Sequence, residues 1–91
     1  MLGKFKLLIH KKALRELNEL PAEDKRQILD AVSMLEADPF RGDVKPVKGL
    51  KGVFRLRVGN YRIAFTVNFK ENEVAILKIA KRKTFYRELK R

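Results

Sequence analysis

The chain of 91 residues carries 22 Lys and Arg against 11 Asp and Glu, a formal net charge of +11. It contains no cysteine, which excludes disulfides, thiolate metal sites and thiol nucleophiles. No apolar run approaches the roughly 18 residues that cross a bilayer, and the N-terminal apolar stretch is too short for a signal peptide. We therefore expect one cytoplasmic domain over residues 1–91, with no cofactor and no membrane partner. The charge favours a polyanionic partner over a merely solvated basic surface.

The excess positive charge lies in two segments. Residues 41–62 carry seven basic side chains against Asp43 alone, and residues 78–91 carry seven against Glu88 alone, so each segment has a net charge of +6. Residues 1–40 are balanced, with seven basic and seven acidic side chains. If the fold brings the two basic segments together, they form one anion-binding surface.

The first half of the chain predicts a strand and a helical pair. Alternating apolar residues predict a strand over residues 4–9, and apolar spacing near 3.6 predicts helices over 10–20 and 22–37. Pro21 separates the two helices, which together form an αα-hairpin. Residues 39–52, rich in Gly, Pro and Lys, are predicted to be a loop.

The second half predicts three strands. Residues 53–58 and 61–69 alternate in polarity around Gly59-Asn60, a two-residue hairpin signal. Residues 73–80 are nearly continuously apolar, which is typical of a strand covered on both faces. Residues 84–91 are compatible with a short helix or a loose tail. The fold class is therefore α+β in the order β-αα-βββ(α), an antiparallel sheet with the helical hairpin packed on one face.

The hairpin register brings arginines together. A two-residue loop places Val58 opposite Tyr61 and Arg57 opposite Arg62, and it puts Arg55 on the same face as both. The core face then takes Phe54, Leu56, Val58, Tyr61, Ile63 and Phe65. Two opposed arginines repel each other, so either an anion lies between them or both side chains splay into water. Removing Arg62 is then expected to leave stability unchanged.

A second group of basic residues follows the last strand. Arg82 is expected at the end of that strand, near the arginine face, and Tyr86 follows four residues later. An aromatic ring beside several guanidinium groups suits a phosphate backbone with a stacked base, although Tyr86 could equally be a core residue of the tail. His10 is the only histidine and has no Ser or carboxylate partner nearby, which argues against a catalytic triad or a histidine metal site. The near absence of acids from the basic segments argues against a two-metal nuclease.

Three segments carry a family resemblance: Lys48-Gly49-Leu50, FRLRVGNYRIAF over residues 54–65, and IAKRKTFY over 79–86. They resemble the RelE/ParE superfamily, specifically its RelE-like toxins. The resemblance covers nearly the whole chain. It implies the toxin of a type II toxin–antitoxin pair, a ribosome-dependent endoribonuclease that cleaves mRNA without a metal, by attack of a ribose 2′-hydroxyl on the adjacent phosphate. The implied partners are the ribosome with its mRNA and an acidic RelB-like antitoxin.

The resemblance also assigns roles to residues. The implied catalytic set is Arg55, Arg57, Arg62, Arg82 and Tyr86, with Arg62 at the transition-state phosphate, Arg82 near the leaving oxygen and Tyr86 stacked on a base. The implied substrate-binding residues are Lys48, Lys51, Lys81 and Lys83. Some family members have lysines at the positions of Arg55 and Arg57, and arginine is not a base near neutral pH. Catalysis here would then rest on positioning and electrostatic stabilisation.

Two other functions remain open at this point. A ParE-like toxin would poison DNA gyrase by binding it, although such toxins generally lack this set of arginines and tyrosine. A catalytically silent protein that binds RNA or an antitoxin is also compatible, because the lysines are missing.

Overall fold

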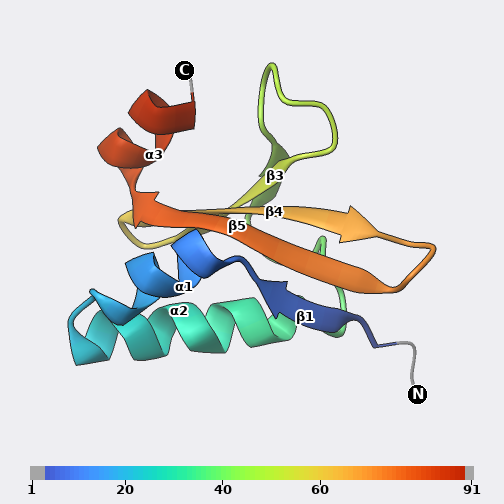
Figure 1. The fold of residues 1–91 in the computed structure, drawn as a ribbon, viewed down its shortest axis with the longest axis horizontal. Coiled ribbons are helices and arrows are strands. Elements are labelled where there is room, and N and C mark those ends of the chain that lie inside the picture. Colours follow the sequence, from blue (N-terminus) through green and yellow to red (C-terminus); the bar gives the residue numbers. More distant parts are fainter. Residues whose placement is uncertain (1–3, 90–91) are drawn as a thin grey trace.

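A five-stranded sheet with helices on both sides forms the domain, and the computed structural model describes residues 4–89 (Figure 1). The strands are β1 (Lys6–Ile9), β2 (Val44–Pro46), β3 (Phe54–Val58), β4 (Tyr61–Asn68) and β5 (Glu73–Lys81), and the helices are α1 (Lys11–Asn18), α2 (Ala22–Met34) and α3 (Arg82–Leu89). The strand order across the sheet is β1-β5-β4-β3-β2. The α+β class and the predicted order of elements are confirmed. No helix within residues 4–89 is long and apolar enough to span a membrane.

The sheet is mixed, which corrects the expected antiparallel sheet. Strand β1 runs parallel to β5, with Lys6 opposite Glu73 and Ile9 opposite Ile76, while all other neighbours are antiparallel. A parallel pair needs a long connection, and here the chain between β1 and β5 runs through two helices and three strands. The apolar pattern of a four-residue strand gives no information about its direction in the sheet.

The segment predicted as a loop over residues 39–52 contains the edge strand β2. Val44 pairs with Leu56 and Pro46 pairs with Phe54. Three residues that include a proline give no alternating pattern, and proline is tolerated in a strand only where its missing N–H is not needed, as at an edge. The strand therefore escapes detection from the sequence.

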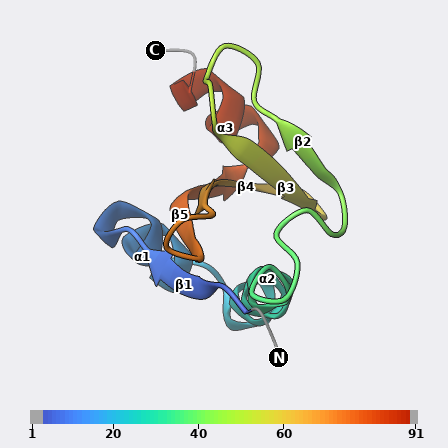
Figure 2. The same cartoon turned by 90° about the vertical axis from the view of Figure 1, so that its right-hand side faces the viewer.

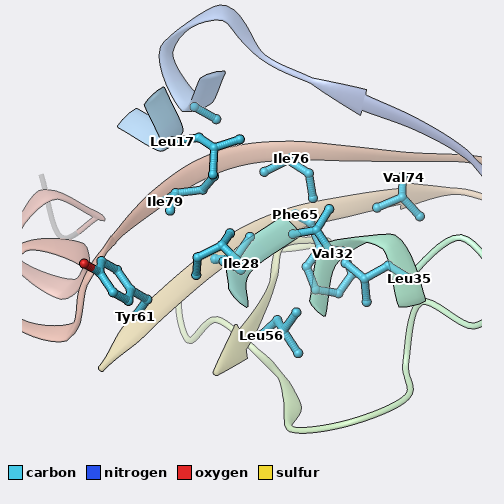
Figure 3. Close-up of a cluster of buried hydrophobic side chains, with 12 residues drawn as sticks. Leu17, Ile28, Val32, Leu35, Leu56, Tyr61, Phe65, Val74, Ile76 and Ile79 are labelled. Atoms are coloured by element: carbon cyan, nitrogen blue, oxygen red, sulfur yellow. The ribbon is translucent and has the colours of Figure 1, made fainter. Parts of the chain in front are cut away.

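The main core lies between one face of the sheet and the helices α1 and α2. Figure 3 shows Ile28 and Val32 of α2, and Leu35 directly after it, facing side chains from β3, β4 and β5. The core-face residues predicted from the hairpin register all belong to this core, which confirms the register. Tyr61 adds a polar tie, since its hydroxyl donates a 2.8 Å hydrogen bond to the Asp24 carboxylate on α2. That bond, with burial, raises the pKa of Tyr61.

Helix α3 lies on the opposite face of the sheet (Figure 2), where it covers a smaller apolar cluster. Its buried members are Ala64, Ala80 and Phe85, and its partly buried members are Val53, Leu77, Tyr86 and Leu89. The helical alternative for the tail is therefore correct. The helix begins at Arg82, two residues earlier than predicted, and residues 90–91 of the prediction lie outside the described part. We refer to this side of the sheet as the α3 face.

Lys78 ties the helices on the two sides of the sheet to each other. Its Nζ donates to Glu16 Oε2 of α1 at 2.8 Å and forms an ion pair with Glu88 of α3, and its side chain is only 6% exposed. Burial lowers the pKa of Lys78, but the hydrogen bonds to Glu16 and Glu88 and the negative charges of both together raise it by more, so the pKa is raised overall. The bond from Lys78 lowers the pKa of Glu88. The sequence places Lys78 within an apolar strand and in the basic segment 78–91, but neither pattern predicts this ion-pair cluster.

Candidate functional site

The β3–β4 hairpin has the register expected from its sequence. Val58 pairs with Tyr61 and Arg57 with Arg62, and Gly59 has a positive φ of 57°, as a two-residue turn requires. The amide of Arg57 donates to the Asp43 carbonyl at 3.0 Å, so it points away from β4. Arg57 and Arg62 therefore form a non-hydrogen-bonded pair, with Cα atoms about 4.5 Å apart. The arginine pair is in the closest arrangement that an antiparallel sheet offers.

Asp43 supplies the negative charge beside this pair. Its Oδ1 accepts from Arg55 Nη1 at 3.1 Å, and its Oδ2 lies 2.8 Å from Arg57 Nε. The hydrogen bond from Arg55 lowers the pKa of Asp43, and the charges of Arg55, Arg57 and Lys45 lower it further. Part of the negative charge expected beside the opposed arginines is thus the Asp43 carboxylate of the protein itself.

Sequence reasoning missed the role of Asp43, although the signal was present. Asp43 is the only acidic residue in the segment 41–62, and neighbouring arginines on a strand need a nearby counter-charge. The turn before the short strand β2 places it there, but the sequence predicts a loop in this segment and so gives no sign that Asp43 lies beside β3. Asp43 therefore places a carboxylate beside arginines that are not themselves bases, although a carboxylate with a lowered pKa is a weak base.

Arg62 is buried, with 8% of its surface exposed. Its Nη1 donates to the carbonyl oxygens of Gly59 at 3.0 Å and Tyr61 at 2.9 Å, so one atom of the guanidinium closes the hairpin turn. A guanidinium has five N–H donors, which leaves Nε and Nη2 outside these two bonds. Removing Arg62 leaves two carbonyls without this donor, so we expect a loss of stability where the sequence led us to expect none.

Helix α3 brings the last two residues of the set to this region. The backbone N–H of Arg82 donates to the Asn60 carbonyl in the hairpin turn at 2.9 Å, which places the start of α3 at the tip of the hairpin. Tyr86 is half-buried on the same helix, and its ring meets Phe85 edge-on with centroids 5.1 Å apart. Tyr86 packs against the small cluster that includes Ala64, the residue opposite Arg55. Part of the ring belongs to this cluster and part remains accessible.

The lysines expected to bind substrate are all exposed. They are Lys48 and Lys51 in the loop between β2 and β3, Lys81 at the end of β5, and Lys83 in α3. In both ribbon views that loop rises on the same side of the sheet as α3 (Figures 1 and 2). The two basic segments therefore meet on the α3 face. Within the described residues, no group of three or more His, Cys, Asp or Glu side chains is placed to hold a metal ion.

Comparison with known proteins identifies the family. Residues 7–86 match the family described as the ParE toxin of the type II toxin–antitoxin system parDE. A Methanocaldococcus jannaschii protein named as toxin RelE1 is 30% identical over 87 residues, which cover 92% of this chain and 97% of that protein.

Solved structures agree with this match. The archaeal RelE–RelB complex from Pyrococcus horikoshii contains a chain with 31% identity and a TM-score of 0.75, over 87% of this chain and 96% of that one. The RelBE2 toxin–antitoxin complex from Mycobacterium tuberculosis contains one with 26% identity and a TM-score of 0.78, over 87% and 99%. The family match over residues 7–86 begins within β1 and ends within α3. The chain therefore belongs to the ParE toxin family and is a RelE-like toxin of a toxin–antitoxin pair.

Proposed function

We propose that this toxin is a ribosome-dependent endoribonuclease that cleaves mRNA. One observation supports the proposal: three arginines of the β3–β4 hairpin share one face, and the helix that begins at Arg82 is hydrogen-bonded to the hairpin turn. Arg55, Arg57 and Arg62 lie on the α3 face of the hairpin, and Arg82 begins the helix that is hydrogen-bonded to its turn. Tyr86, one turn later, provides an aromatic ring beside them. Such a set can bind a phosphate and stack on a neighbouring base.

The proposed reaction is an internal phosphoryl transfer within the RNA strand. The ribose 2′-oxygen attacks the adjacent phosphorus, a new P–O2′ bond forms, and the P–O5′ bond breaks. The products are a 2′,3′-cyclic phosphate and a 5′-hydroxyl. The 2′-hydroxyl proton passes to solvent or to a ribosomal RNA group, and the leaving 5′-oxygen takes up a proton. Charge develops on the phosphate oxygens, which is where fixed guanidinium groups contribute most.

Programmed ribosomes provide the test of this activity. Wild-type protein is added to ribosomes that carry a defined mRNA, and cleavage is mapped by primer extension under single-turnover conditions. Arg57→Ala removes an exposed arginine of the hairpin and is expected to lower the rate by about 100-fold or more. Lys70→Ala, an exposed cation in the turn between β4 and β5, is the matched control and should stay within about 2-fold. No cleavage by the wild-type protein would refute the nuclease function.

We further propose that the toxin is neutralised by an acidic, RelB-like antitoxin. The relatives from Pyrococcus horikoshii and Mycobacterium tuberculosis are complexes of toxin with antitoxin. The net charge of +11 supports capture of an acidic partner, and such attraction is screened by salt. The acidic protein encoded beside this gene should bind with an affinity that falls between about 50 mM and 500 mM salt. An affinity that stays flat over this range would contradict electrostatic capture.

DNA gyrase is the second candidate target, because the matching family is that of the ParE toxin. A gyrase supercoiling assay with the purified toxin separates the two functions. Inhibition of supercoiling together with intact mRNA on ribosomes would replace the nuclease proposal by the ParE-like one.

A further inference from the structure

Asp43 is held firmly beside the arginines by its backbone as well as its side chain. Its carbonyl oxygen accepts two hydrogen bonds, one from the amide of Arg57 and one from Arg55 Nη1, both at 3.0 Å. Gly42, the preceding residue, has a φ of +89°, and a Cβ atom there would lie 3.7 Å from Leu56. The positive φ is strained for other residues, so the turn that delivers Asp43 to β3 depends on a glycine. The Asp43 carboxylate therefore occupies a defined position next to β3.

The two arginines that it contacts differ in how much they depend on it. The Arg55 side chain is only 13% exposed and has a second acceptor in the Asp43 carbonyl. The Arg57 side chain is 56% exposed, and within residues 4–89 the carboxylate of Asp43 is its one polar side-chain contact. A long exposed side chain has much rotamer freedom to lose. The orientation of Arg57 therefore depends on Asp43 far more than that of Arg55.

The contact also determines which part of Arg57 faces a ligand. Asp43 Oδ2 forms its ion pair with the Nε of Arg57. The two terminal nitrogens of the guanidinium therefore remain available for a bidentate contact with a phosphate. Without the carboxylate, Arg57 lies opposite Arg62 in a close pair, and repulsion drives its side chain outward into water. The carboxylate offsets this repulsion and keeps the guanidinium beside β3.

We infer that Asp43 is a positioning residue of the toxin, which orients the Arg57 guanidinium toward the RNA phosphate. The inference rests on the proposed nuclease function. A carboxylate in an anion-binding site can act as a repulsive charge or as a positioning group, and these two roles predict different effects on kcat and KM. As a mere negative charge, Asp43 weakens RNA binding, so its removal lowers KM and leaves kcat unchanged. As a positioning residue, it raises kcat, because a small misplacement of a catalytic group costs up to about 100-fold in rate.

Kinetics on programmed ribosomes distinguish these roles. Asp43→Asn is expected to lower kcat by about 10- to 100-fold without raising KM, and Asp43→Glu, which keeps the carboxylate, to recover most of the rate. Asp30→Asn, the same change at an exposed position on α2, is the matched control and should match the wild type. An Asp43→Asn variant with wild-type kcat would overturn the inference while leaving the nuclease function intact.

A double-mutant cycle tests whether Asp43 acts through Arg57. If it does, Asp43→Asn in an Arg57→Ala background should change the rate by less than about 2-fold. An effect as large as in the wild-type background means that Asp43 acts through Arg55 or on its own, for instance as a base, and overturns the inference that it positions Arg57. This result is distinct from failure of the proposed function, in which the wild-type protein itself does not cleave mRNA.

A measurement without RNA completes the test. In the free protein labelled with ¹⁵N, the Nε–H of Arg57 should give a resolved, rigid NMR signal that becomes mobile in Asp43→Asn. The signal should remain rigid in the Asp30→Asn control. Equal mobility of Arg57 in the wild type and in Asp43→Asn would contradict the inference even if the rate falls.

Discussion

The two faces of the sheet are stabilised by different physical means. The face toward α1 and α2 buries a continuous apolar core with Phe65, Ile63 and Ile76 fully enclosed. The apolar cluster of the α3 face has only three buried residues. The side chains of Asp43, Arg62 and Lys78 add ion pairs and hydrogen bonds that connect the elements on this side. The face toward α1 and α2 is held by apolar packing, whereas the α3 face has less apolar packing and more charged side chains. The candidate site thus lies on the face with the smaller apolar cluster.

Two buried phenylalanines give the largest test of this difference. Phe65 and Phe85 are both fully buried, on the main-core face and the α3 face respectively. Phe65→Ala should lower the free energy of unfolding by about 3–5 kcal/mol, and Phe85→Ala by a smaller amount, about 2–3 kcal/mol, because α3 can relax. Urea denaturation measures both. Hydrogen exchange should show the loss in Phe85→Ala confined to α3, and equal losses over the whole sheet would mean that both faces form one cooperative unit.

Lys78 should be the most important polar residue for stability. Lys78→Met keeps the apolar length of the side chain but removes the hydrogen bonds to Glu16 and Glu88, which we expect to cost about 1–3 kcal/mol. Lys70→Met, the same change at an exposed position, should lie within about 0.5 kcal/mol of the wild type. If both variants unfold at the same urea concentration, Lys78 does not connect α1 with α3 energetically.

The opposed arginines should differ in their contribution to stability. Arg62 is buried and donates to two carbonyls, so Arg62→Ala should cost about 1–2 kcal/mol. Arg57 is more than half exposed, and Arg57→Ala removes both its ion pair with Asp43 and its repulsion with Arg62, so the two effects offset each other and the net loss should be about 0.5 kcal/mol. Thermal unfolding of the two variants makes the comparison. A stable Arg62→Ala variant would restore the view that Arg62 is held at the site at a cost to the fold.

The pH dependence of stability should be the smallest effect, and on the acid side it should belong to the α3 face. The pKa values of Asp43 and Glu88 are lowered in the folded protein. Their stabilisation is therefore complete above their unfolded pKa values of about 4 and is lost as the pH falls through the folded values. The pKa of Lys78 is raised, so its contribution is complete below about pH 10 and is lost as the pH rises through the folded value.

Melting temperatures from pH 2 to 6 test the acid side. The double variant Asp43→Asn, Glu88→Gln should lose less stability on acidification than the wild type, whereas Asp30→Asn should not differ from it. Curves of the same slope for the wild type and the double variant would show that the ion pairs on the α3 face contribute nothing to folding.

The sequence determined the central hairpin well because its signals are local. The two residues Gly59-Asn60 fix the pairing of every residue from Phe54 to Phe65, and the register and core face follow from that. The direction of β1 and the existence of β2 depend on contacts between distant segments, which periodicity does not report. The role of Asp43 could not be predicted because the sequence gives no sign of β2. The burial of Arg62 could not be predicted because no sequence pattern shows that α3 covers this face of the sheet. Local signals place the site residues, and tertiary contacts decide how each one is held.

The contact between Glu16 and the backbone of β5 has a consequence for association with other chains. Exposed strand edges offer free N–H and carbonyl groups to any neighbouring strand and promote aggregation. Glu16 Oε1 accepts from the N–H of Ile79 at 2.8 Å, so a side chain of α1 occupies the part of the β5 edge that lies beyond its pairing with β1. The outermost strands are only four and three residues long, and β2 ends in a proline that has no N–H to offer. The short edge strands, the proline of β2 and the capped stretch of β5 thus reduce the template that this sheet offers to an added strand.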